Sequence, residues 1–255
     1  PLDLVDITDK DSADASGDSE STPTEHTDPP FLSPRPTAPP PPPPSLLLGE
    51  GPHHQAHAFH SAMQSPFDNS LVLTMDGSGD KHCSVLWCHN GTKLEKLKEI
   101  VIPNSMGWVY AAFTEYLGFE AYDGEYKVMG LAAYGRYRSD ISSKMDKIVH
   151  WIEQTNEYQV DPTYIHYGPR TYSDRYTDYL VELFGKPPRL PIDPITSWHE
   201  DIAYGVQAKL EEIATRLVSW GIRETGYQNV CIGGGVGLNV KMNTQIFRMP
   251  KVKDI

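Results

Sequence analysis

The stretch LVLTMDGSGD (71–80), with HHQAHAFHSAMQSPF (53–67) just before it, decides the interpretation of the fold. Leu71 to Met75 is an apolar run of strand length, and it ends in a carboxylate followed by glycines. Pro52 is favoured in the first turn of a helix, so the segment before the strand predicts a helix that runs to about Gln64. A helix followed directly by a buried strand indicates a layered α/β or α+β body.

Further strands and helices alternate along the chain. CSVLWC (83–88) and LKEIVI (97–102) are candidate strands around an Asn90-Gly91 turn. Helices are predicted at 108–117, 141–154 and 200–224, the last from apolar residues at spacings of three and four. That helix leads through Gly226 into NVCIGGGVGLNVKMN (229–243), which predicts a strand, a glycine turn and another helix.

Composition divides the chain near residue 47. Of the net charge of -12, -8 falls in residues 1–28, where nine acids face Lys10 alone, and a proline run fills 39–44. Such a segment buries too little apolar surface to fold, so residues 1–47 are predicted to be a disordered acidic, proline-rich arm. Residues 48–255 are predicted to form one domain. That body has no basic stripe that would neutralise a nucleic-acid backbone, which argues against DNA or RNA as a partner.

Neither a membrane nor an oxidising compartment is indicated. No apolar run approaches the roughly 18 residues of a membrane-spanning helix, and the N-terminus lacks a signal-peptide pattern. Cys83, Cys88 and Cys231 are an odd number without a CxxC pair, which favours reduced thiols over a disulfide framework. We therefore expect a cytoplasmic protein.

A metal site is predicted from two histidines and one carboxylate. His53 and His57 are four residues apart on the predicted helix, so their imidazoles project from one face. Asp76 follows the strand, at the end where α/β folds bind their ligands. Two histidines with a carboxylate suit iron(II), zinc or manganese. The alternative is a pair of surface histidines and a simple Asp-Gly hairpin turn.

Three glycine-containing segments are candidates for nucleotide binding. The backbone N–H groups of Gly77, Ser78 and Gly79 could approach a phosphate closely. GGGVGLN (233–239) lacks the spacing of the dinucleotide fingerprint, but its amides and the following helix N-terminus could hold an anion. In GEYKVMGLAAYG (124–135), Glu125 and Lys127 could engage metal and phosphate. The alternatives are tight turns for the first two segments and a surface loop with a buried Val-Met-Leu strip for the third.

Taken together and in this order, the motifs of residues 50–250 closely resemble the NodU/CmcH-type O-carbamoyltransferases; they include NSMGWVYAAFTEYLGFEAYDGEYKVMGLAAYG (104–135). The resemblance implies an actin-like ATPase (ribonuclease H-like) fold. It also implies that carbamoyl-adenylate is made from carbamoyl phosphate and ATP in a second, C-terminal domain, and that the carbamoyl group passes here to the hydroxyl of a small-molecule acceptor. By the same resemblance, His53, His57 and Asp76 bind the metal, which is iron in the family. The turn of Gly233, Gly234 and Gly235 with Asn239 binds the nucleotide.

Both ends depart from the family pattern. Nothing before residue 48 resembles the family's first strand and its Asn-Ala-Ser-His-type loop, and a further metal-binding aspartate is expected beyond Ile255. We therefore expect a fragment that is inactive alone, and we assign no catalytic residue. The alternative is a non-catalytic remnant that binds nucleotide or a partner, with the arm as its working part. The acceptor, the metal and the oligomeric state stay open, and a homo-oligomer is compatible with the sequence.

Overall fold

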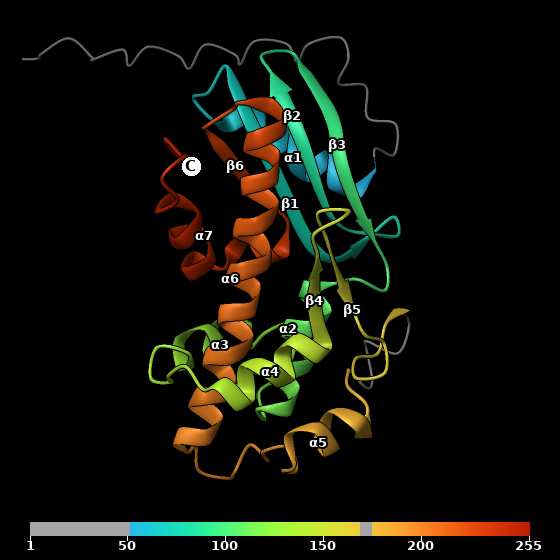
Figure 1. Cartoon of the computed structure of the whole chain (residues 1–255), viewed down its shortest axis with the longest axis vertical. Coiled ribbons are helices and arrows are strands. Elements are labelled where there is room, and N and C mark those ends of the chain that lie inside the picture. The colour runs from blue at the N-terminus through green and yellow to red at the C-terminus, as the bar shows by residue number, and fades with distance from the viewer. Residues whose placement is uncertain (1–51, 169–174) are drawn as a thin grey trace, which may run out of the picture. The chain divides into compact units, whose positions relative to one another are not determined.

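The computed structural model describes residues 52–168 and 175–255, in which helices pack on both faces of a four-stranded sheet (Figure 1). The predicted arm and its boundary at residue 47 lie outside these residues. The strands are β1 Asn69–Gly79, β2 His82–Asn90, β3 Lys93–Val101, β4 Val149–Ile152, β5 Glu157–Val160 and β6 Val230–Gly233. The helices are α1 His53–Gln64, α2 Met106–Tyr116, α3 Glu125–Leu131, α4 Ser139–Ile148, α5 Asp178–Phe184, α6 Ser197–Thr225, α7 Val240–Phe247 and the 3-10 helix η2 Gly235–Leu238.

The main sheet has the strand order β3-β2-β1-β6. β1, β2 and β3 form an antiparallel meander, whereas β6 lies parallel to β1 on its other side. Asp80 and Lys81 connect β1 to β2 with φ angles of 52° and 71°, the positive values that two-residue hairpin turns require. The turn predicted at Asn90-Gly91 is present one residue later, with Gly91 and Thr92 between the paired residues Asn90 and Lys93.

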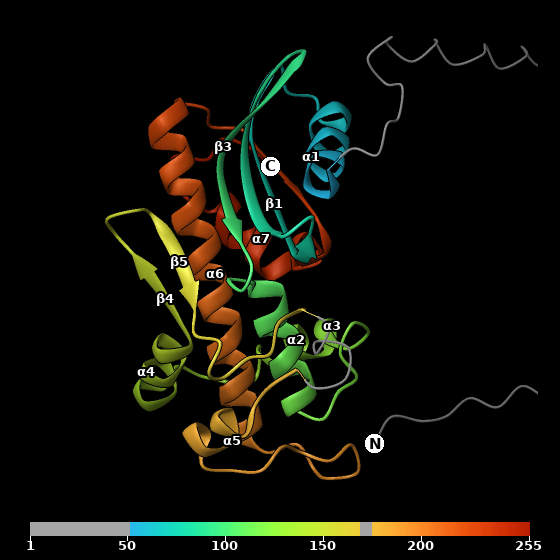
Figure 2. The same cartoon turned by 90° about the vertical axis from the view of Figure 1, so that its right-hand side faces the viewer.

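Residues of β1 alternate between two buried faces. Leu71, Leu73 and Met75 belong to the large core shared with α2 and α6, while Val72 packs with Ala58 of α1 in a smaller cluster. Figure 2 shows α1 and α6 on opposite sides of the sheet. A strand buried on both faces reads as a continuous apolar run, which is why LVLTM has no polar alternation.

The predicted helix at 141–154 is wrong after residue 148. α4 ends at Ile148, and Val149 to Ile152 pair as β4 with β5 in a separate two-stranded sheet. β-branched Val149 and aromatic Trp151 favour a strand, and Asn156 takes a φ of 54° in the turn that follows. The other predicted helices form as α1, α2, α6 and α7, and the predicted strands form as β1, β2, β3 and β6.

These elements give the mixed α/β body that the sequence predicts. Within residues 52–168 and 175–255, no helix combines the length and the apolar character needed to cross a bilayer.

Candidate metal and nucleotide site

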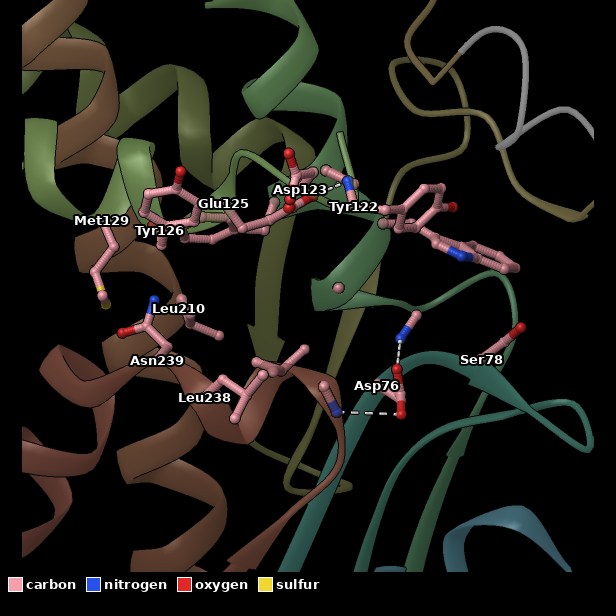
Figure 3. A pocket seen from close by; sticks show the side chains of 17 residues that line it. Asp76, Ser78, Tyr122, Asp123, Glu125, Tyr126, Met129, Leu210, Leu238 and Asn239 are labelled. Atoms are coloured by element: carbon pink, nitrogen blue, oxygen red, sulfur yellow. Dashed lines mark hydrogen bonds between the residues drawn. The ribbon is translucent and has the colours of Figure 1, made fainter. Parts of the chain in front are cut away.

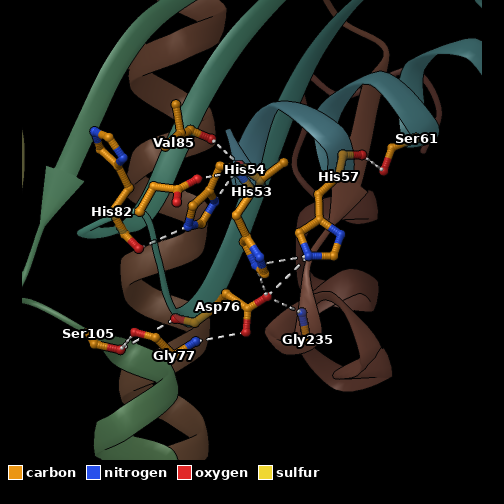
Figure 4. Close-up of polar contacts among 12 residues, drawn as sticks. His53, His54, His57, Ser61, Asp76, Gly77, His82, Val85, Ser105 and Gly235 are labelled. Atoms are coloured by element: carbon orange, nitrogen blue, oxygen red, sulfur yellow. Dashed lines mark hydrogen bonds and ion pairs between the residues drawn. The ribbon is translucent and has the colours of Figure 1, made fainter. Parts of the chain in front are cut away.

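His53, His57 and Asp76 converge at one end of the sheet (Figure 4). Asp76 Oδ2 lies 3.1 Å from His53 Nε2 and 3.3 Å from His57 Nε2, and the two imidazole nitrogens are 3.2 Å apart. We call these three residues the triad. Within the described part of the chain, this is the one cluster of three or more His, Cys or acidic side chains suited to a metal ion.

The donor atoms of the triad fit a transition-metal ion. Metal–ligand bonds of about 2.1 Å separate neighbouring ligand atoms by about 3.0 Å at right angles and by about 3.4 Å in a tetrahedron. The observed edges of 3.1 to 3.3 Å lie between these values. Two imidazoles and one carboxylate form the donor set of non-haem iron(II) and catalytic zinc sites.

The turn between β1 and β2 fixes the N-terminal end of α1. Asp80 accepts the backbone N–H of His53, one of the donors that the first turn of a helix leaves unpaired. A Cβ on Gly79 would lie 2.1 Å from Cδ2 of the His53 ring, so only glycine leaves room for this imidazole. The absence of a side chain at Gly79 therefore makes space for the His53 imidazole.

Asp76 is held by two backbone amides besides the histidines. Gly77 N–H donates to Oδ1 over 2.9 Å, and Gly235 N–H donates to Oδ2 over 3.2 Å. Burial alone would raise the pKa of Asp76, but the hydrogen bonds from His53, Gly235 and Gly77 hold it below its ordinary value. The carboxylate is consequently charged and oriented.

A cavity of 570 Å³ opens beside Asp76 (Figure 3). Its walls come from the end of β1, from α2, α3 and η2, and from the middle of α6. The lining residues are Asp76, Gly77, Ser78, Gly107, Trp108, Tyr110, Ala111, Tyr122, Asp123, Glu125, Tyr126, Met129, Leu210, Gly235, Val236, Leu238 and Asn239. We call this cavity the aromatic pocket, because one tryptophan and three tyrosines contribute to it. Asp76 belongs to both the triad and the pocket.

The glycine segment after Asp76 belongs to β1, which ends at Gly79. Its pairing with β2 is irregular between Met75 and Gly79, and the contact of these amides with a phosphate stays a prediction. Gly77 and Ser78 still line the aromatic pocket, whereas Gly79 packs against His53.

The second glycine segment is the expected strand, turn and helix. Gly234 has a φ of 86°, and a Cβ there would lie 2.3 Å from the Met75 carbonyl oxygen. Gly235 and Asn239 line the pocket, but Gly233 and Gly234 do not; a Cβ on Gly233 would meet Ser61 Oγ at 2.6 Å. These glycines let the turn pass close to β1 and α1.

Asn239 has little capacity left for a ligand. Its Oδ1 accepts the N–H of Met242 at the start of α7 and the amide of Gln207, and its Nδ2 donates back to Gln207 Oε1. Tyr110 donates its hydroxyl to the same Gln207 oxygen. After these bonds, one N–H of the Asn239 side-chain amide can still donate to a ligand.

The segment with Glu125 and Lys127 forms helix α3 and not the surface loop of the alternative interpretation. Glu125 is half-buried in the pocket wall and accepts the Tyr122 backbone N–H over 2.8 Å. Lys127 lies outside the pocket lining, with its Nζ 5.6 Å from the Tyr126 ring. Of these two candidate residues, Glu125 lines the pocket and Lys127 does not.

The aromatic residues of the pocket were missed from the sequence. Trp108, Tyr110, Tyr122 and Tyr126 come from α2, α3 and the segment between them, and they read as ordinary core or surface residues. The sequence of a helix with polar and aromatic residues does not indicate whether its aromatic side chains line a pocket or pack against another element.

Comparison with known proteins identifies the chain. Residues 45–255 match the family model described as carbamoyltransferase N-terminus. The chain belongs to this carbamoyltransferase family. This confirms the family resemblance that the motifs indicate.

The relatives are much longer than this chain. The uncharacterized protein sll1178 of Synechocystis sp. is 37% identical over 210 residues, which are 82% of this chain and 33% of that protein. Nodulation protein NolNO of Sinorhizobium fredii is 31% identical over 203 residues, 80% of this chain and 28% of that protein. Nodulation protein NolO of Bradyrhizobium diazoefficiens is 30% identical over 206 residues, 80% and 34% respectively. The chain spans about a third of the length of these relatives.

Proposed function

We propose that this domain passes a carbamoyl group from carbamoyl-adenylate to a hydroxyl of a small-molecule acceptor, with a divalent metal, iron(II) by family resemblance, at the triad. One observation carries the proposal: Asp76 lies in both the triad and the aromatic pocket. A nucleoside in the pocket would therefore place its 5′-phosphate beside the triad.

The charges of the two parts support this division. Among the described residues, the pocket lining includes Asp76, Asp123 and Glu125 but no lysine, arginine or histidine. The pocket suits the uncharged base and ribose better than a phosphate, and its aromatic rings offer stacking surfaces. A metal at the triad would supply positive charge next to the departing phosphate. The N–H groups of Gly77 and Gly235 keep Asp76 oriented for that ion.

The sheet topology supports an actin-like ATPase fold as part of the proposal. Three antiparallel strands in sequence order are followed, beyond long helical insertions, by β6 parallel to β1. Asp254 then makes a parallel bridge to Asn229 on the outer side of β6. In open sheets with such crossovers, ligands bind at the carboxyl ends of the strands, where Asp76 and the Gly234 turn meet.

Formation of the carbamoyl-adenylate is a separate proposal about the whole protein. The relatives extend well beyond the matched region, and we assign the use of carbamoyl phosphate and ATP to their additional length. The absence of nucleic-acid and membrane partners stays a prediction from composition, as does the cytoplasmic location.

The test is a calorimetric titration of AMP into the chain with and without Co(II) as a spectroscopic substitute for iron. We expect AMP to bind weakly alone and at least 10-fold more tightly with Co(II), because the ion would link the phosphate to the triad. His57→Ala should remove the Co(II)-dependent gain and leave the basal affinity, whereas His60→Ala, on the exposed side of α1, should change neither. AMP binding that never responds to metal would contradict the proposal.

Freshly prepared carbamoyl-adenylate separates this function from the non-catalytic alternative. Transfer of its carbamoyl group to an added alcohol, faster than to water, would support catalysis by this chain itself. Binding without transfer would favour a nucleotide-binding remnant, or a site that needs residues present in the longer relatives. The same assay in a full-length relative distinguishes these two outcomes.

A further inference from the structure

Helix α1 carries two adjacent rows of side chains with different partners. His53, His57 and Ser61 form one row, in which Ser61 Oγ donates to the Ile232 carbonyl of β6 over 3.1 Å. The buried row is His54, Ala58 and Ala62. Two alanine methyl groups bury little apolar surface, so polar contacts have a large share in fixing how α1 sits on the sheet.

His54 is the polar member of the buried row and is 2% exposed. Its Nδ1 lies 3.0 Å from Thr74 Oγ1 on β1, and its Nε2 lies 3.0 Å from the His82 carbonyl oxygen on β2 (Figure 4). Trp87 Nε1 donates to the same Thr74 hydroxyl over 3.2 Å. One side chain of α1 is thus bound to two strands of the sheet at once.

The partners assign the tautomer of His54. Both ring nitrogens are in contact with a polar group of the sheet. A carbonyl oxygen accepts only, so Nε2 carries the proton that reaches the His82 carbonyl, and Nδ1 lies 3.0 Å from the Thr74 hydroxyl. That hydroxyl receives the Trp87 N–H and has one proton of its own, for which both Nδ1 and the Val85 carbonyl oxygen, 3.2 Å away, are within reach. These contacts join one buried side chain of α1 to both β1 and β2.

We propose that His54 is a positioning residue that fixes the rotation of α1 and thereby keeps His53 and His57 in register with Asp76. The inference rests on the proposed metal site. Imidazole nitrogens on a helix lie about 6–7 Å from its axis, so a rotation of about 5° moves them by about 0.6 Å. Shifts of that size loosen a metal site, whose ligands must be held within about 0.5 Å.

The experiment measures Co(II) affinity and the visible absorption spectrum of the bound ion, in the whole chain, far below the melting temperature. His54→Phe keeps a ring of similar size but removes both hydrogen bonds, and we expect Co(II) to bind about 10- to 100-fold more weakly, with an altered spectrum at saturation. His54→Gln can still donate to the His82 carbonyl and should recover part of the affinity. His60→Phe, also on α1 but exposed, is the matched control and should match the unmodified chain.

A spectrum at saturating Co(II) separates positioning from mere loss of stability, because only folded, loaded protein absorbs. Thr74→Val, which removes the partner of His54 Nδ1, provides a second variant if His54→Phe fails to fold, and should weaken binding by a smaller factor. Folded variants with unchanged affinity and spectrum would overturn the positioning role while leaving the metal site in place. If the unmodified chain does not bind Co(II), the metal site and the positioning role both fall.

Discussion

The triad and the aromatic pocket share Asp76 but are built in opposite ways. The triad is three polar groups whose ligand atoms lie 3.1 to 3.3 Å apart. The pocket is a cavity of 570 Å³ with tyrosines at its rim that are more than half exposed, Tyr122 and Tyr126. The triad is a compact set of ligand atoms, whereas the pocket is a wide cavity with aromatic walls.

The difference shows how one carboxylate is shared between the triad and the pocket. Asp76 Oδ2 faces the histidines and Gly235, while Oδ1 receives the Gly77 amide within the pocket wall. Binding at the triad should therefore be sensitive to sub-ångström changes, and binding in the pocket should depend on contact area. Variants that change only the triad or only the pocket test whether binding at the two parts is independent.

The largest effect is expected from removing a ligand of the triad. His57→Ala should weaken Co(II) binding by at least 100-fold, since one of three protein ligands is lost. Adenosine, which has no phosphate, should bind as before because His57 does not line the pocket. Absorption titration with Co(II) and calorimetry with adenosine check the two halves. Loss of adenosine binding together with Co(II) binding would show that the two parts are not separable.

A smaller effect is expected in the pocket alone. Tyr126→Ala removes an exposed ring at the rim and should weaken adenosine binding by about 10-fold, within the range of about 1–3 kcal/mol for stacking on a base. Tyr134→Ala is the control, because Tyr134 is even more exposed but does not line the pocket. Equal losses for both tyrosines would remove the assignment of the nucleoside to this pocket.

The same contrast explains what the sequence could predict. The triad was predictable, because an i,i+4 histidine pair and a strand-end aspartate are local patterns with direct geometric consequences. The pocket was not, since Trp108, Tyr126 and Leu238 are brought together only by the packing of α2, α3 and η2. Gly79 shows the same limit: a glycine indicates a close approach, but the sequence does not say that His53 is the side chain that packs on it.

The contact between Gly79 and His53 gives a third prediction, which concerns the triad. Gly79→Ala would place a methyl group 2.1 Å from the unshifted His53 ring, so the imidazole must move, and Co(II) binding should weaken by about 10-fold. The control is Gly130→Ala on α3, where an added Cβ meets nothing within 4 Å. If Gly79 instead held phosphate, its substitution would reduce AMP affinity without metal and spare Co(II) binding. Titrations with each ligand alone tell these cases apart.

The smallest effect is expected from the charge at the N-terminal end of α1. Asp80 accepts the His53 N–H and places a negative charge at the positive end of the helix dipole. Asp80→Asn removes the charge but keeps an acceptor, and asparagine tolerates the φ of 52° that alanine would not. We expect a loss of about 0.3–1 kcal/mol, which corresponds to a decrease of about 1–4 °C in the melting temperature of a domain of this size. Because salt screens the dipole interaction, the difference in melting temperature from the unmodified chain should shrink as ionic strength increases. The control is Asp68→Asn, which is exposed and remote from that end of the helix and should show no such dependence. A decrease that is independent of salt would mean that Asp80 acts through hydrogen-bond geometry alone, and the N-terminal end of α1 would then be held by the same kind of contact as His54 holds its buried face.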